Sequence, residues 1–246
     1  MKKELPSSFP QEILPDLISY LKHLEGKGIR SLYLDDIEES GPFEQPSSTS
    51  AEGGEPVPVT AIRKDLAELE EGVRACTDCP LHETRTQVVF GVGNPGTKVM
   101  FIGEAPGRDE DLQGEPFVGR AGQLLTKILE AIDQKRENVY ITNILKCRPP
   151  DNRDPQESEV RCCEKYLISQ IELIQPKLIC ALGRIAAQWL LQTKAPLGTL
   201  RTGEYYYQGI RVLVTYHPAA LLRNPQFKRP AWEDFKKLKA MLEASP

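Results

Sequence analysis

The sequence predicts an α/β fold in three layers, αβα, with a central four-stranded parallel sheet between two layers of helices. One observation is that four short apolar runs occur, each as long as a strand that is buried on both faces. Another is that amphipathic helical patterns separate these runs, and strands that alternate with helices are typical of βαβ units. The four predicted strands are 99–102, 139–143, 178–182 and 212–215.

The size and hydrophobicity of the chain suit one α/β domain with an additional segment. The 246 residues are 40% hydrophobic, which is enough for a substantial core. No run of 18 apolar residues occurs, so we expect no membrane partner. The first residues, MKKELPSSFP, lack the apolar stretch of a signal peptide, which predicts a cytoplasmic protein, and we expect a monomer.

The N-terminal part of the chain differs in composition from the rest. Residues 1–39 carry one apolar helical stripe and predict a small helical appendage, which either docks a protein partner or has no binding role. Residues 40–60 are rich in Gly, Pro, Ser and Glu and predict a flexible linker. Residues 1–71 hold 15 acidic and 7 basic side chains, whereas residues 72–246 hold 20 and 24. The predicted catalytic domain, 61–246, therefore lacks most of the acidic excess, and a nucleic acid stays a possible partner.

The helices of this domain are predicted from apolar side chains at helical spacing. The first begins at Thr60, and a hairpin over 203–208 is expected before the last strand. The remaining predicted helices cover 121–133, 156–174, 184–192 and 230–243.

Polar or small residues follow each of the four predicted strands. Glu104 follows the first, Asn143 ends the second, Gly183 follows the third and His217 follows the fourth. Each of them alone has an ordinary structural explanation, such as a turn cap for the Asn. The carboxyl ends of parallel strands meet at one edge of a sheet, however, so we expect a shared site there.

Four motifs resemble the successive signatures of family 4 uracil-DNA glycosylases, the iron-sulfur branch of the uracil glycosylase superfamily. They are GEAPGRDED, PFVGRAGQLL, YITNILKCRPP and HPAALLRNP, in order and at the expected spacing over about 72–242. The resemblance implies removal of uracil from DNA by cleavage of its N-glycosidic bond. It leaves residues 1–60 outside the core that it covers.

Two residues of these motifs have the chemistry needed to bind a flipped base. Phe117 offers a flat face for stacking, and the Asn143 amide can accept from uracil N3–H and donate to O4. Cytosine reverses both groups, and such a bidentate contact is worth about 1–3 kcal/mol of discrimination. In the resembling family, the aromatic residue and the Asn at these positions have these roles.

The catalytic candidates follow from the charge that develops as the bond breaks. His217 is placed to donate to uracil O2, which becomes negative. Glu104 is the first candidate for positioning water, and Asn152 is a weaker one. Ala105 stands where single-domain uracil glycosylases have an Asp, so it is inert here. Glu110 is expected on the C5 side of the base, where it would hinder thymine, or else on a solvated acidic face.

The motif HPAALLRNP also suggests how the enzyme would hold an opened duplex. Leu221, with Leu222 beside it, is expected on a projecting loop as a wedge that fills the gap left by the base, unless it is part of the core. Arg223 is expected to meet phosphate, and Lys228 and Arg229 extend a basic rim.

The cysteine pattern predicts a metal site rather than disulfides. A CxxC followed by distant cysteines suggests a metal or cluster in a cytosolic chain. The resemblance implies that Cys76, Cys79, Cys147 and Cys163 hold a [4Fe–4S] cluster, with a zinc site as the alternative. Cys162 would point about 100° away from its neighbour on a helix. Cys180 is expected as a buried core thiol.

Two other function classes are compatible with parts of the sequence. A non-catalytic DNA-binding protein would keep the basic rim but would not need Phe117 and Asn143 in a pocket. A covalent DNA-capturing relative carries an Arg-rich insertion that ends in a nucleophilic His, and the stretch GEPFVGRAGQ has neither. The sequence therefore favours turnover.

Overall fold

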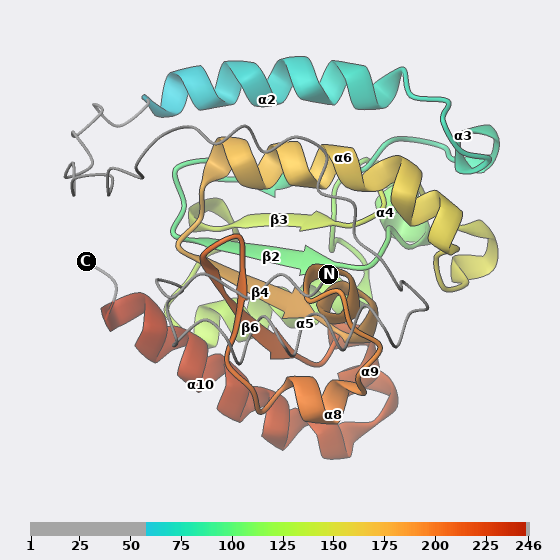
Figure 1. Cartoon of the computed structure of the whole chain (residues 1–246). Helices are drawn as coiled ribbons and strands as arrows, with labels where there is room; N and C mark the ends of the chain where they lie inside the picture. Colours follow the sequence, from blue (N-terminus) through green and yellow to red (C-terminus); the bar gives the residue numbers. More distant parts are fainter. Residues whose placement is uncertain (1–57, 245–246) are drawn as a thin grey trace, which may run out of the picture. The chain divides into compact units, whose positions relative to one another are not determined.

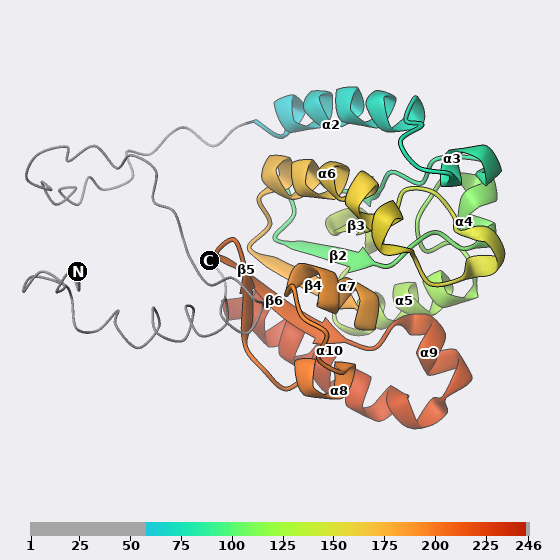
Figure 2. The same ribbon diagram turned by 45° about the vertical axis from the view of Figure 1, so that its right-hand side comes forward.

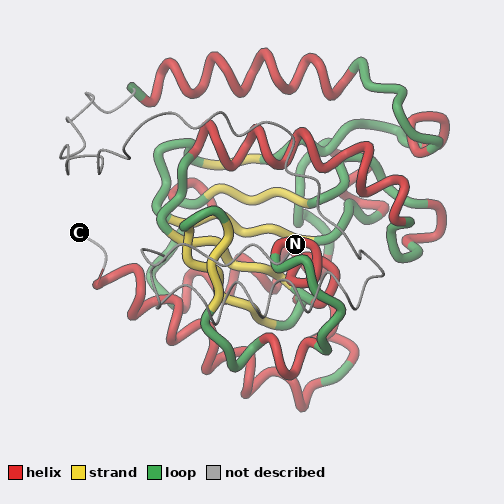
Figure 3. Tube along the Cα trace, in the orientation of Figure 1, coloured by secondary structure: helices red, strands yellow, loops and turns green. Residues whose placement is uncertain are grey.

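The computed structural model of the chain describes residues 58–244, drawn in colour in Figure 1 and by secondary structure in Figure 3. The predicted helical appendage and most of the predicted linker lie outside these residues. The first helix, α2 (Val59–Arg74), begins within the last residues assigned to the linker. Among the described residues, no helix is both long enough and apolar enough to cross a membrane.

One mixed sheet of six strands, in the order β1-β3-β2-β4-β6-β5, forms the centre of the described region. Its four inner strands are parallel, as predicted, whereas the two edge strands are antiparallel to their neighbours. The β5–β6 pair is the predicted hairpin, and β1 was not predicted. The strands are β1 (Val92–Gly93), β2 (Val99–Gly103), β3 (Tyr140–Asn143), β4 (Leu178–Leu182), β5 (Tyr205–Tyr207) and β6 (Ile210–Thr215).

Helices cover both faces of the sheet, because alternate strand side chains point to opposite faces. Met100 and Ile102 of β2 belong to the core that packs against α2, α6, α7 and α8. Val99 and Phe101 of the same strand belong to the core against α5 and α10. The predicted three-layer arrangement is therefore confirmed. The remaining helices are α3 (Leu81–Thr84), α4 (Arg108–Gln113), α5 (Arg120–Ala131), α6 (Glu157–Ile174), α7 (Arg184–Leu190), α8 (Leu197–Leu200), α9 (Pro218–Arg223) and α10 (Lys228–Ala244), with 3₁₀ turns η1 (Arg136–Asn138), η2 (Pro150–Asn152) and η3 (Pro225–Phe227).

The parallel strands all end on the same side of the molecule. In Figure 2 the arrowheads of the inner strands face the side on which α4 and α9 lie. The chain leaves β2 toward α4 and leaves β6 toward α9, so both short helices are placed at the carboxyl edge of the sheet. Ligand sites of open α/β sheets form at this edge.

Candidate active site

A cavity of about 460 Å³ opens at the carboxyl ends of the parallel strands. The residues at the ends of the four strands, Glu104, Asn143, Gly183 and His217, all line it. All seven predicted catalytic and base-binding residues lie in its wall, together with the predicted phosphate ligand. These are Glu104, Ala105, Glu110, Phe117, Asn143, Asn152, His217 and Arg223.

Asn143 ends β3 and is almost fully buried. Its Oδ1 has no hydrogen-bond partner among the described residues. Leaving a buried acceptor without a hydrogen bond costs roughly 1–3 kcal/mol of folding free energy. Such an acceptor is understandable where a bound ligand supplies the missing donor. Gly103 leaves room for this amide, because a Cβ there would lie 2.3 Å from Asn143 Oδ1 and 2.7 Å from Phe117 Cζ.

The loop that carries Phe117 is held in a demanding backbone conformation. Phe117 has a φ of 55°, in the left-handed region that few aromatic residues adopt. Arg136 donates to the carbonyl groups of Pro116 at 2.7 Å and Phe117 at 3.1 Å. Gly122 permits the close packing, since a Cβ there would lie 1.8 Å from the Phe117 carbonyl oxygen. The ring is therefore fixed at the cavity wall, with its centroid 5.4 Å from that of His217.

Glu110 has a role in this loop that the sequence did not indicate. Its Oε1 accepts from the backbone N–H groups of Val118 at 3.0 Å and Gly119 at 2.9 Å. These amides begin the segment that enters α5, so the carboxylate also meets the positive end of that helix. Glu110 lines the cavity, and it also anchors the Phe117 loop.

His217 is neutral and has a defined proton position. It is the N-cap of α9, and its Nδ1 accepts from the Ala219 N–H at 3.2 Å. With Nδ1 as an acceptor, the proton of the neutral ring lies on Nε2. Burial, and secondarily the charge of Arg223, lowers the pKa of His217 to about 4. The ring is therefore an uncharged Nε2–H donor at neutral pH.

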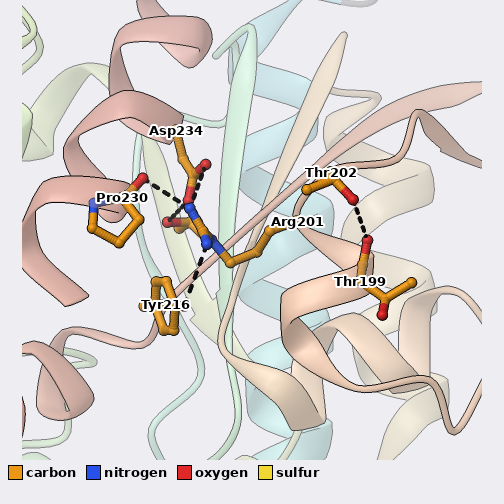
Figure 4. A network of polar contacts seen from close by, with 7 residues as sticks. Thr199, Arg201, Thr202, Tyr216, Pro230 and Asp234 are labelled. Atoms are coloured by element: carbon orange, nitrogen blue, oxygen red, sulfur yellow. Dashed lines mark hydrogen bonds and ion pairs between the residues drawn. The ribbon is translucent and has the colours of Figure 1, made fainter. Parts of the chain in front are cut away.

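A network behind the pocket holds the strand that leads to His217 (Figure 4). Arg201 and Asp234 form a largely buried ion pair, with Nε to Oδ2 at 2.8 Å and Nη2 to Oδ1 at 3.0 Å. The same carboxylate accepts from the Thr215 hydroxyl at 2.8 Å, and Arg201 donates to the hydroxyl of Tyr216 at 3.3 Å. The two residues that precede His217 are thereby tied to α10.

Glu104 is a partly buried carboxylic acid with a raised pKa. Burial is the main cause and repulsion from Asp154 the second, and the pKa reaches about 7 although Arg184 and Arg223 oppose the shift. A carboxyl group with a pKa near neutrality suits acid–base chemistry. Asn152 lies farther out, where its Oδ1 accepts from Arg148 Nε at 2.7 Å.

The expectation that Leu221 projects from a loop is wrong. The segment forms helix α9, in which Leu221 is 2% exposed and Leu222 is 45% exposed. Neighbouring residues point about 100° apart around a helix, so the two leucines meet different surroundings. Leu222 is therefore the exposed apolar side chain of this helix, and Leu221 belongs to the core.

A second, much smaller cavity is lined by cysteines from three segments far apart in sequence. They come from the loop between α2 and α3, from the chain after β3, and from α6. No three His, Cys, Asp or Glu side chains in residues 58–244 are grouped closely enough to chelate one metal ion. The cysteines that line this cavity are Cys76, Cys79, Cys147, Cys162 and Cys163, and none forms a disulfide.

Hydrogen-bond donors contact two of these thiols. Arg85 Nη1 lies 3.3 Å from Cys147 Sγ and 2.9 Å from the Cys76 carbonyl oxygen. The backbone N–H of Lys146 donates to Cys163 Sγ at 3.3 Å. Cys162 also lines this cavity, although it was expected to point about 100° away from Cys163. Cys180 is fully buried in β4, as predicted.

Comparison with known proteins identifies the family. Residues 90–236 match the family model described as Uracil DNA glycosylase superfamily, and the chain belongs to this superfamily. The Type-4 uracil-DNA glycosylase of Archaeoglobus fulgidus is 46% identical over 183 residues, covering 71% of this chain and 92% of the relative. Those of Saccharolobus solfataricus and Thermotoga maritima are 45% and 44% identical, each over 74% of this chain and over 88% and 97% of the relative. These relatives narrow the assignment to the type-4 branch, as the motifs predicted.

Proposed function

We propose that the protein removes uracil from DNA in base excision repair by hydrolysing the N-glycosidic bond, which leaves an abasic site. The unpaired, buried Oδ1 of Asn143 beside the fixed ring of Phe117 carries this proposal. The names of the similar type-4 proteins state the same activity.

Uracil is read by one amide and one ring. A flipped uracil lies against Phe117, donates its N3–H to Asn143 Oδ1 and accepts the amide N–H at O4. Cytosine would present an acceptor to Oδ1 and a donor to the NH₂ group, so both contacts would fail.

Bond cleavage uses His217 and Glu104 in different roles. The neutral His217 donates from Nε2 to uracil O2 as negative charge develops there, which stabilises the departing base. Ionised Glu104 orients the water that attacks the sugar carbon and takes its proton. Asn152 remains the weaker candidate for contact with that water. Ala105 adds a small apolar surface and no charge.

DNA is held by the exposed side of α9. Leu222 fills the space from which the base was extracted, while Arg223 meets phosphate at the cavity edge. Leu221 acts indirectly, since its burial fixes α9 against the domain.

The cysteine cavity suits a [4Fe–4S] cluster held by Cys76, Cys79, Cys147 and Cys163. The four thiolates would hold the cluster by sulfur ligation alone. Free thiols around one cavity match the thiolate-only donor set of such a cluster, and zinc bound by the same four thiolates is the alternative. The cluster would supply a structural cross-link between the segment around 76–79 and the chain from 147 to 163.

The setting of the protein is also a proposal. Free thiols suit a reducing compartment, and we assign the protein to the cytoplasm as a monomer. A protein partner for residues 1–39 is a hypothesis from the sequence.

The activity is tested with anaerobically purified protein and with oligonucleotides that contain one uracil in single- or double-stranded form. Alkali then cuts the strand at abasic sites. We expect cleavage products for uracil and none for cytosine. Asn143→Asp should lose about 10–100-fold in rate, the scale of one bidentate contact. Absence of cleavage by iron-containing wild-type protein would rule out the enzyme.

A further inference from the structure

Lys146 lies between the two sites and has no role in the proposed reaction. Its side chain is fully buried, with 0% exposure. The ammonium donates to Thr142 Oγ1 at 2.7 Å, to the Asn143 carbonyl oxygen at 2.8 Å and to Gln170 Oε1 at 2.6 Å. Its three hydrogen bonds are thus satisfied by neutral acceptors.

The charge of this lysine is not balanced by a carboxylate. Among residues 58–244, no Asp or Glu forms an ion pair with Lys146. Hydrogen bonds to neutral groups do not compensate for the loss of water around a charge, so a buried cation generally has an anion nearby. Burial lowers the pKa of Lys146 to about 7, and the protein groups around it supply hydrogen bonds but no balancing charge.

The missing negative charge lies on the side of the cysteines. Lys146 lines the cysteine cavity, and its backbone N–H donates to Cys163 Sγ at 3.3 Å. It also directly precedes Cys147 in the chain. Four thiolates around a cluster leave a net negative charge in this cavity.

The Lys146 ammonium also contacts Asn143, the residue proposed to read the base. Lys146 holds the backbone carbonyl group of Asn143, and Thr142 and Gln170 complete the support. Gln170 in turn donates to the Phe90 carbonyl oxygen at 3.0 Å and to the Tyr140 hydroxyl at 3.2 Å. The end of β3 is therefore fixed by a connected set of buried polar groups.

We propose that Lys146 is a positioning residue that serves as counter-ion to the anionic cluster and, with the same ammonium group, fixes Asn143 for uracil. This inference rests on the proposed glycosylase function and its cluster. It makes cofactor loading and base recognition depend on one side chain. The cluster thereby affects the reaction without contacting DNA.

Three substitutions separate the charge from the hydrogen bond. Lys146→Met removes both, Lys146→Gln keeps an N–H donor without charge, and Lys146→Arg keeps the charge. We measure iron per chain, the midpoint potential of the cluster and the single-turnover rate of uracil excision. A nearby cation stabilises the reduced cluster, so the potential should become more negative in Lys146→Met and Lys146→Gln and stay near wild type in Lys146→Arg. Excision should slow by about tenfold or more in Lys146→Met, with partial recovery in Lys146→Gln, while affinity for abasic DNA changes little.

Lys165→Met is the matched control. Lys165 also lies near the cysteine cavity, but it is half exposed and pairs with Asp78. Its removal should leave both the potential and the excision rate near wild type, because water screens an exposed charge.

The outcomes distinguish this inference from the proposed function. Iron loss from both neutral variants but not from Lys146→Arg would support it. Unchanged potential and rate in the neutral variants, or equal iron loss in all three, would overturn it. Wild-type protein without iron or without uracil excision would instead refute the proposed function.

Discussion

The base pocket and the cysteine cavity differ in how far the protein itself satisfies their polar groups. In the pocket, His217 and the Phe117 loop are held by protein hydrogen bonds. Asn143 Oδ1 is the one buried side-chain nitrogen or oxygen atom without a hydrogen-bond partner in residues 58–244. In the cysteine cavity, burial raises the pKa of Cys79 and of Cys147, and that of Cys163 to about 12. Thiols of this kind ionise when a metal centre binds them.

This difference separates the consequences of substitution. Pocket side chains are held by a frame that does not depend on the substrate, so their removal should lower the rate and spare the fold. Cysteine ligands join three chain segments through the cofactor, so their removal should lower stability first. The following experiments test that contrast, from the largest expected effect to the smallest.

Cys163→Ala should lose the cluster and much of the stability. A loss of about 4 kcal/mol is a fraction of the ~10–16 kcal/mol that structural zinc sites supply, and it would lower Tm by roughly 8–16 °C. Iron analysis and thermal unfolding measure this. Cys180→Ala, a buried thiol of the sheet, should keep its iron. Full iron retention in Cys163→Ala would mean that its neighbour Cys162 is the ligand, and a double variant would decide between them.

His217→Ala should slow single-turnover excision by about 10²–10³-fold, the scale of a lost donor to developing negative charge. Tm and affinity for abasic DNA should change little, because the lost contact forms during bond cleavage. A variant that cleaves normally once bound, but binds abasic DNA poorly, would assign the residue to docking.

The pH dependence should report Glu104. Below its pKa of about 7 this acid is protonated and cannot take a proton from water, so the rate should rise about tenfold from pH 6 to pH 8 and then level off. His217 has a pKa of about 4 and stays neutral from pH 6 to pH 8, so its titration does not change the rate in this range. Glu104→Gln should be slow and independent of pH. A persistent rise in that variant would exclude Glu104 as its source.

Leu222→Ala should have the smallest effect and the most selective one. It should slow excision from double strands by about 3–10-fold more than from single strands, since only a stacked base needs extraction. Leu221→Ala is the matched control, because loss of a buried Leu costs about 2–5 kcal/mol of stability and should affect both substrates alike. Equal losses on both substrates for Leu222→Ala would remove it from the wedge role.

The sequence predicted the parallel strands and the convergence of Glu104, Asn143 and His217, because strand periodicity and parallel topology determine where the carboxyl ends lie. It did not predict β1, since two residues give no periodic signal. It also could not choose between Leu221 and Leu222, because neighbouring residues of one short helix face different environments only after the helix packs.

Two polar roles lay beyond sequence reasoning for a different reason. Glu110 anchors backbone amides eight and nine residues away, and Lys146 lies beneath a strand end. Acidic and basic side chains are usually solvated, so their burial follows only from the assembled core. The motif YITNILKCRPP contains the lysine between the predicted Asn and Cys, and that position was the one available signal.

Gly103 has a consequence for interpreting natural variants of this chain. Every other amino acid adds a Cβ, and here that carbon would meet the reading amide and the stacking ring together. A missense change at this codon is therefore expected to be a loss-of-function allele whichever residue it introduces, and chemical similarity to glycine offers no protection. Genotype alone would predict the repair defect at this position, whereas a change at Ala105, two residues further on, has to be judged by assay.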